Sequence, residues 1–231
     1  PYSSFYLSGS ATQKTKGELK GGLDVKYGIN DAFTLDAILV PDFGQTKFDN
    51  VVLNLGPFEQ QFNENRPFFT EGTDLFSKGN LLYSRRIGQT PDLNLNINEN
   101  ESVESPGAIN LLNALKVSGR DKDGLGIGFL NAITEKTMAT ISNDDNDDTR
   151  YIEISPLTNY NVMVFDQRFN QNSSVTFINT NVTRNGSFRD ANVTGLLFDL
   201  NNKTNTYNLS GGLKSSSIND VENKNGYNAS L

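Results

Sequence analysis

The chain has 231 residues and a net charge of −7, with no histidine, cysteine or tryptophan. Without cysteine it can form no disulfide or thiolate site, and without histidine it can form neither a Ser-His-Asp triad nor imidazole metal ligands. The acidic balance argues against a nucleic-acid partner, which would need a basic face. The low mean hydropathy of −0.48 and the lack of a long apolar run exclude a membrane helix. A membrane β-strand remains possible, because it needs only one apolar face over about 9–11 residues.

Alternating apolar and polar residues predict strands from the first residues onward. The run from Tyr2 to Leu7 reads as a strand, and no initiator methionine or signal peptide precedes it. We therefore expect an internal fragment of a longer secreted chain. The alternation is clearest in 18–28, where Leu23, Val25 and Tyr27 share one face, and it continues after a turn. Further strands are predicted at 33–39, 109–120, 125–134, 151–155, 159–169, 174–182, 191–200 and 206–213.

In two of these strands, the pattern of apolar residues bears on which side chains lie on which face of the sheet. In 125–134, Leu125, Ile127, Phe129 and Ile133 fall on one side and are expected to face lipid. Gly126 and Gly128, on the other side, would let the wall bend or let another segment approach closely. In 159–169, apolar residues occupy both sides, so the sequence leaves the face assignment open.

Short turns and long connections alternate between the strands. Tight turns are expected at 28–32, 121–124, 170–173 and 201–205, and longer connections at 41–108, 135–150 and 183–190, with a tail from about 214. If neighbouring strands are antiparallel, all tight turns fall at one end, as in outer-membrane barrels with short periplasmic turns. The predicted fold is therefore all-β: a fragment of an antiparallel up-and-down transmembrane β-barrel, with 1–231 in one domain. A soluble β-sandwich is the alternative architecture.

The connection at 41–108 is too long for an ordinary loop and is expected to be functional. Its many phenylalanines predict a packed plug, and the spacing of Phe58 and Phe62 predicts a short helix from Pro57 to just before Pro67. Its charged residues form either a salt-bridged plug in a polar lumen or the paired carboxylates of a glycosidase. These residues are Asp42, Glu64, Arg66, Glu71, Asp74, Arg85 and Arg86.

One acidic run offers oxygen ligands of the kind that calcium prefers. It contains Asp144, Asn146 and Asp148 at alternate positions, but it lacks the glycine and the distal glutamate of an EF-hand loop. A solvated acidic loop tip explains the same residues.

Several motifs, spread over most of the chain, carry a resemblance to a known family. Val40-Pro-Asp-Phe-Gly-Gln45, Asn65-Arg-Pro-Phe-Phe-Thr-Glu-Gly72 and Leu82-Tyr-Ser-Arg-Arg-Ile-Gly88 are the clearest. With them the chain resembles an outer-membrane family of Bacteroidota, in which a family-nine-type carbohydrate-binding module precedes a large C-terminal β-barrel. The resemblance implies a bacterial outer-membrane location. It brings no catalytic residues and no cofactor, and the carbohydrate-binding module and the remaining strands would lie outside this chain.

The sequence therefore leads to a first functional hypothesis: an outer-membrane barrel that acts as a pore, transporter or scaffold, with a link to glycan handling. Its expected partners are outer-membrane lipid, other outer-membrane or periplasmic proteins, and carbohydrate through the upstream module. A carbohydrate-active hydrolase with carboxylates in 41–88 is one alternative. A soluble β-sandwich binding module is the other.

Overall fold

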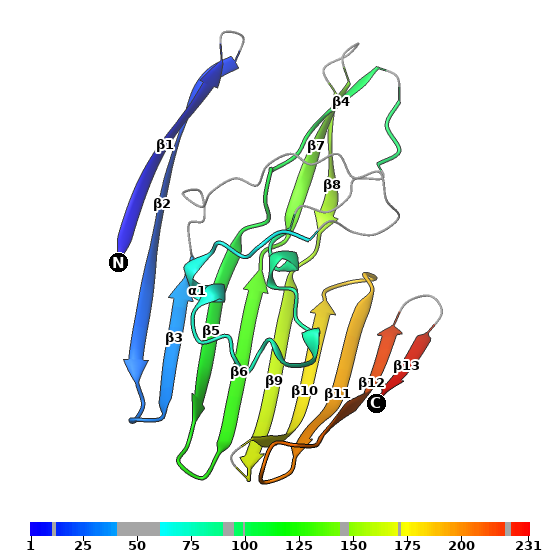
Figure 1. The fold of residues 1–231 in the computed structure, drawn as a ribbon. Coiled ribbons are helices and arrows are strands. Elements are labelled where there is room, and N and C mark those ends of the chain that lie inside the picture. The colour runs from blue at the N-terminus through cyan, green and yellow to red at the C-terminus, as the bar shows by residue number, and fades with distance from the viewer. Residues whose placement is uncertain are drawn as a thin grey trace.

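The computed structural model describes residues 1–10, 13–40, 61–89, 95–98, 100–143, 148–170, 172–219 and 223–231. A ten-stranded antiparallel sheet dominates these residues (Figure 1). Its strands follow the chain order, in the sequence β1-β2-β3-β5-β6-β9-β10-β11-β12-β13, as in an up-and-down sheet. Their bounds are β1 Tyr2–Ser10, β2 Gln13–Gly28, β3 Phe33–Leu39, β5 Leu111–Arg120, β6 Leu125–Thr134, β9 Thr158–Phe169, β10 Ser173–Arg184, β11 Asp190–Asn201, β12 Asn208–Asn219 and β13 Lys224–Ser230.

A second sheet of three strands projects beyond one end of the first. It has the order β4-β7-β8, with β4 at Glu101–Glu104, β7 at Thr137–Asn143 and β8 at Thr149–Ser155. The strands β7 and β8 continue the paired strands β6 and β9 upward in Figure 1. The expected long loop at 135–150 is therefore wrong, because most of it is strand. The expected loop at 183–190 is also shorter than predicted, since β10 reaches Arg184 and β11 begins at Asp190.

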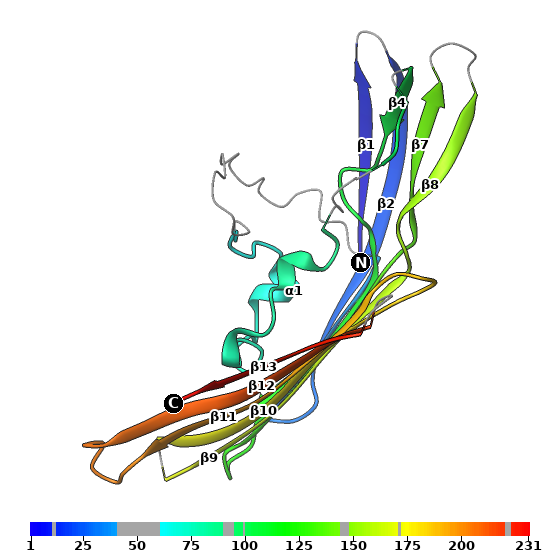
Figure 2. The same ribbon diagram turned by 90° about the vertical axis from the view of Figure 1, so that its right-hand side faces the viewer.

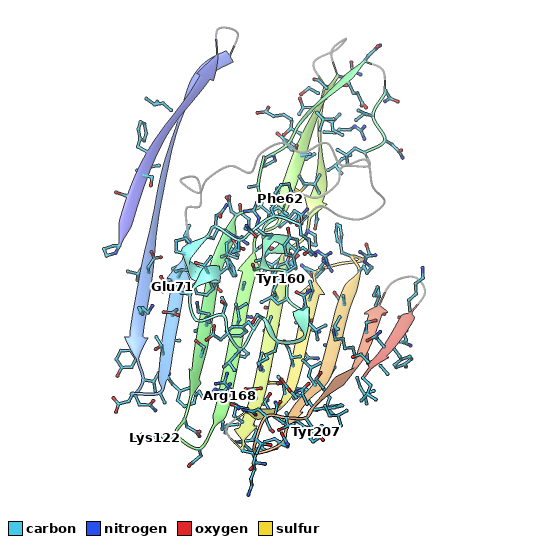
Figure 3. All side chains as sticks on the ribbon, viewed as in Figure 1. Phe62, Glu71, Lys122, Tyr160, Arg168 and Tyr207 are labelled. Atoms are coloured by element: carbon cyan, nitrogen blue, oxygen red, sulfur yellow. The ribbon has the colours of Figure 1, made fainter. Side chains whose placement is uncertain are left out.

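The four predicted tight turns are confirmed, and all lie at one end of the large sheet (Figure 1). Lys122 and Tyr207, from two different turns, mark this end in Figure 3. Three of the turns contain a residue with a left-handed backbone: Gly124, Asn170 and Asn205, with φ of 88°, 47° and 52°. Glycine and asparagine tolerate this conformation better than other residues, which explains their presence in these turns.

The connection between β3 and β5 contains a compact piece, residues 61–89, which we call the inner segment. It carries one short helix, α1 at Pro67–Thr70, and 3₁₀ turns at Lys78–Asn80 and Ser84–Arg86. The helix expected from Pro57 to just before Pro67 is wrong over 61–66, which are not helical, and its first residues, 57–60, lie outside the described residues. Arg66 is extended, with φ of −81° and ψ of 121°, because a residue that precedes proline avoids the helical region. The helix instead starts at Pro67, which suits the first helical position.

Figure 2 shows the inner segment on one side of the curved sheet, which we call the inner face. The hydrophobic core lies between the two and includes Phe68, Phe69, Leu75 and Phe76 from the segment. Strand register also resolves the open face assignment of 159–169. Val162 and Val164 belong to this core, whereas Met163 and Phe165 lie on the opposite, outer face, where they are 39% and 41% exposed.

The outer face is ordered in rows of directly paired residues that cross the strands. The row through Ile127 is free of polar side chains: Phe33, Gly119, Ile127, Phe165, Phe177, Leu196, Leu213 and Ala229. The next row toward the three-stranded sheet is apolar up to Met163 on β9 and then changes to Asn179, Thr194 and Ser215, before ending on Tyr227.

The polar part of the outer face widens in the following rows. In the row through Asn131 the change comes between β5 and β6. That row reads Val25, Ala37, Leu115, Asn131, Asn161, Asn181, Asn192, Ser217 and Asn225. One row further, the change comes between Leu39 on β3 and Asn113 on β5, although Ile133 remains apolar beyond it. The boundary between apolar and polar residues on the outer face is therefore oblique. Between the first and the last of these three rows, which lie four residues apart along β6, the boundary moves by three strands.

Candidate functional site

The inner segment fits the sheet because two glycines leave room for it. A Cβ atom at Gly128 would lie 3.1 Å from the Phe76 ring, and one at Gly126 would lie 2.8 Å from Leu75. Both glycines are on β6, and Phe76 and Leu75 of the inner segment lie against them. The Arg120 guanidinium of β5 lies equally close to the Cβ position at Gly126, at 2.8 Å. Of the two roles that the sequence left open for these glycines, the close approach of another segment is the one observed.

A buried lysine joins the segment to the sheet. Lys116, on β5, is 1% exposed, and its ammonium donates hydrogen bonds to the backbone carbonyls of Phe68 at 2.7 Å and Glu71 at 2.6 Å. The carboxylate of Asp36, on β3, lies 3.4 Å from the same nitrogen. The ammonium also lies 4.7 Å from the centre of the Phe68 ring, a cation–π distance. The Lys116 ammonium therefore binds the backbone of the inner segment, and none of its protons is left for acid–base catalysis.

Three further contacts spread the attachment across the sheet. Lys26 on β2 pairs with the Glu71 carboxylate at 2.6 Å, and Figure 3 shows Glu71 beside β3. Lys78 of the segment lies 3.6 Å from Asp166 on β9. Lys214 on β12 donates to the carbonyl of Gly79 at 2.8 Å. Together with Lys116, these contacts fasten the segment from β2 to β12.

Asp166, the partner of Lys78 on strand β9, has its own network of contacts. Its side chain is fully buried and accepts a hydrogen bond from the Thr176 hydroxyl at 2.5 Å. The Arg120 guanidinium also donates to this carboxylate. A buried carboxylate is tolerated only with such partners, so Lys78 meets an anion that the sheet already holds in place.

A second network lies inside the segment. The Arg66 guanidinium binds both carboxylate oxygens of Glu64, at 2.8 Å through Nε and 2.7 Å through Nη2. It also donates to the carbonyls of Ser84 at 2.7 Å and Ile87 at 2.6 Å, and it stacks 4.3 Å over the Phe69 ring. Burial opposes the charge of Glu64, but Arg66 and the Ser84 hydroxyl together hold the pKa of Glu64 below its usual value.

The predicted polar cluster is thus only partly one unit. Glu64 and Arg66 are paired, whereas Glu71 pairs with Lys26 of the sheet. Asp74 is exposed, Arg85 is half-buried, and Arg86 lies 5.8 Å over the Tyr83 ring. Asp42 lies outside the described residues.

The acidic run gives no metal site that can be described. Asp144 and Asn146 lie outside the described residues, and the backbone carbonyl of Asp148 accepts a hydrogen bond from Asn143 at 2.9 Å. Among the described residues, no group of three or more acidic side chains is placed to hold a metal ion. Within the same residues, no helix is long and apolar enough to cross a membrane.

Sequence reasoning missed the residues of the sheet that hold the segment. Lys26, Lys116, Asp166 and Lys214 are all inward-facing charges on four different strands. Lys116 stands out in hindsight, because it interrupts the run Leu115-Lys116-Val117 at a position that faces the core.

Fold and site together define an all-β protein: a large antiparallel sheet with one of its own connections fastened across its inner face. A family model described as "Domain of unknown function (DUF5916)" matches residues 1–231. The chain belongs to that family. No curated protein and no solved structure shows significant similarity to it.

Proposed function

We propose that this domain forms part of the wall of an outer-membrane β-barrel, whose lumen is closed by the inner segment. The observation that carries the proposal is the outer face. Its apolar row contains Phe165 at 41%, Leu196 at 48% and Leu213 at 60% exposure. Soluble proteins rarely expose apolar patches that continue across so many strands, whereas lipid covers such a band on a membrane barrel.

The oblique polar boundary supports the same proposal. Barrel strands are tilted by about 35–45°, are about 4.8 Å apart and rise about 3.3 Å per residue. A membrane plane therefore crosses neighbouring strands at positions about one residue apart. The boundary on the outer face shifts by three strands over four residues, close to this value. A soluble sheet with a covered face has no reason to show this slope.

The sheet edges also favour closure in a membrane. Within the described residues, β1 and β13 each pair on one side only. Unpaired backbone groups are costly in hydrocarbon, so both edges of a membrane wall must pair with further strands. In the proposed barrel, β1 and β13 pair with strands that complete the closed wall.

The inner segment then determines what the barrel does. It crosses the lumen side of the sheet from β2 to β12 and is held there by charged and backbone contacts. We therefore propose a gated pore in its closed state, in which opening requires release of these contacts. The pairing of Glu64 with Arg66 fits a structural role in the closed state better than a catalytic acid or base.

Two arginine substitutions on the same face test the membrane wall. Phe165→Arg introduces a charge into the apolar row, and Asn181→Arg is its matched control on the polar side of the boundary. In a lipid-facing wall, Phe165→Arg should reduce stability in vesicles by about 2–4 kcal/mol and Asn181→Arg by at most about 1 kcal/mol. Equal effects of the two substitutions, together with monodisperse wild-type protein in buffer without detergent, would overturn the proposal and favour a soluble sheet.

Gating is tested separately in planar bilayers. Deletion of residues 67–80 removes the part of the segment that spans the inner face, and it should raise the conductance of inserted protein. If the deleted form inserts but conducts no more than wild type, the segment does not close the lumen.

A further inference from the structure

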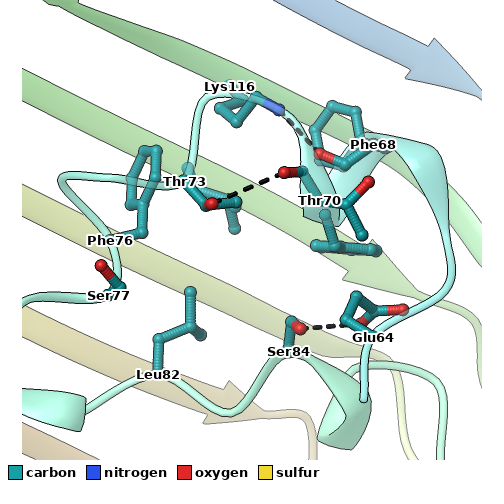
Figure 4. A pocket seen from close by; sticks show the side chains of 11 residues that line it. Glu64, Phe68, Thr70, Thr73, Phe76, Ser77, Leu82, Ser84 and Lys116 are labelled. Carbon is teal, nitrogen blue, oxygen red and sulfur yellow. Dashed lines mark hydrogen bonds between the residues drawn. The ribbon is translucent and has the colours of Figure 1, made fainter.

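The inner segment does not fill all the space next to the sheet. It curves around a hollow of about 290 Å³, which we call the well and which Leu130 and Lys116 of the sheet also line. Figure 4 shows Lys116 and residues of the segment around it. Small-molecule sites begin at about 300 Å³ and are mostly apolar, with a few polar groups. The well therefore has room for a single ring rather than a chain. Thr70 and Ser77 at its rim are exposed, so solutes can reach it.

Four hydroxyl groups line the well, and each already uses its proton. Thr70 donates to the carbonyl of Pro67 at 3.0 Å and Thr73 to that of Thr70 at 3.5 Å. Ser77 donates to the carbonyl of Asp74 at 3.1 Å, and Ser84 donates to the Glu64 carboxylate at 2.7 Å. A hydroxyl that donates its proton keeps lone pairs to accept with. The polar side of the well therefore presents hydrogen-bond acceptors, which match a ligand that donates hydrogen bonds.

The two charges that line the well are neutralised. The carboxylate of Glu64 accepts from both Arg66 and Ser84. The Lys116 ammonium has two backbone carbonyls and Asp36 as partners. Neither charge is left to attract an ion, so the well selects neither a cation nor an anion.

The remaining walls are apolar. Phe68, Phe69, Phe76 and Leu82 of the segment line the well above Leu130. The rings of Phe68 and Phe69 stand edge to face, 5.0 Å apart and at 87° to each other. These side chains make one side of the well apolar, opposite the set of acceptors.

We propose that the well binds a small, neutral, polyhydroxylated ring compound. The hydroxyl groups of the ligand donate to the threonine and serine oxygens, and one face of its ring packs against the phenylalanines. The proposal uses only the inner segment and the sheet beneath it, so it stands or fails independently of the membrane wall.

A series of six-membered rings tests the ligand class on detergent-solubilised protein by saturation-transfer NMR and calorimetry. The probes are myo-inositol, glucose, cyclohexanol and cyclohexylammonium. The two polyols should bind at least about tenfold more tightly than cyclohexanol, since each added hydrogen bond contributes about 1 kcal/mol. Tighter binding of cyclohexylammonium would show an available anion and overturn the proposal, as would failure of both polyols to bind.

Two variants locate the binding in the well. Thr73→Val keeps the shape of the side chain but removes an acceptor, and it should weaken polyol binding by about fivefold, the equivalent of about 1 kcal/mol. Ser77→Leu fills the rim and should abolish binding. Ser215→Ala, on the outer face, is the control and should bind as wild type does. If all three variants bind equally, the polyol does not occupy the well. Because none of these measurements uses lipid, their failure would leave the arginine test of the wall unaffected.

Discussion

The ammonium of Lys116 lies 2.6 Å from the backbone carbonyl oxygen of Glu71, although 45 residues separate the two in sequence. This hydrogen bond ties strand β5 of the sheet to the end of helix α1. The charge is fully buried, and the two atoms of the segment that accept its hydrogen bonds are backbone carbonyls, which any sequence would supply. Lys116 thus fixes the position of the inner segment without requiring a particular side chain from it.

Replacing Lys116 with methionine tests this attachment. Lys116→Met leaves two carbonyls without their donor and removes the nearer of the two lysines from Asp36, and breaking a buried pair of this kind costs about 3–5 kcal/mol. Denaturant unfolding of the solubilised protein should show a loss of that size. Lys26→Met, which breaks the exposed pair with Glu71, is the control and should remain close to wild type. Equal losses in the two variants would show that burial of Lys116 adds nothing to the stability that this attachment contributes.

Acidification should loosen the inner segment through Glu64. The pKa of Glu64 is lower in the folded protein than in the unfolded chain, where it is about 4.3. Its contribution to stability is therefore complete above that pH and is lost as the pH falls through the lower, folded value. Unfolding measured from pH 7 downward should show this loss in wild type and a flatter profile in Glu64→Gln. Asp74→Asn, an exposed carboxylate in the same segment, should keep the wild-type profile.

The glycine at the contact between segment and sheet should not tolerate a side chain. Gly128→Leu would place atoms where the Phe76 ring lies, and overpacking of this kind costs about 1–3 kcal/mol. We expect the segment to lift from the sheet and trypsin to cleave faster after Arg86. Gly28→Leu is the control, because a Cβ there meets nothing within 4 Å. Cleavage at the wild-type rate in Gly128→Leu would mean that the segment adapts in place.

The tight turns and the three-stranded sheet should lie on opposite sides of the membrane. Asp123 is in the turn between β5 and β6, and Tyr151, which is 68% exposed, is on β8 at the other end. A cysteine at Tyr151 should react with an impermeant reagent on intact cells, and a cysteine at Asp123 should react only after the outer membrane is opened. Reaction of both from outside would contradict this orientation.

The sequence predicted nine strands of the large sheet through the alternation of apolar and polar residues. It missed β13 at Lys224–Ser230, because the residues from about 214 suggested a tail. It also located the tight turns through their glycine and asparagine residues. It missed β7, because the acidic run after Asn143 suggested that a loop already begins near 135. It placed a helix before Pro67, although the constraint that proline imposes on Arg66 argues for a start at Pro67 itself.

The site was less accessible to sequence reasoning. Glu64 and Arg66 are two residues apart, and their pairing could be anticipated. The partners Lys116, Asp166 and Lys214 are distant in sequence and meet the segment only because the register of the strands turns them inward. A single sequence contains no pattern that joins such residues.

The most direct measurement of the central claim is quenching of single tryptophans by brominated lipid, since the chain has no tryptophan of its own. Three variants sample the sheet: Phe165→Trp in the apolar row, Asn181→Trp beyond the polar boundary, and Ser216→Trp on the inner face. A membrane wall predicts strong quenching of Phe165→Trp by lipid brominated on its acyl chains, weak quenching of Asn181→Trp, and none of Ser216→Trp. Equally weak quenching of all three in protein bound to vesicles would show that the outer face does not contact lipid, and would contradict the account.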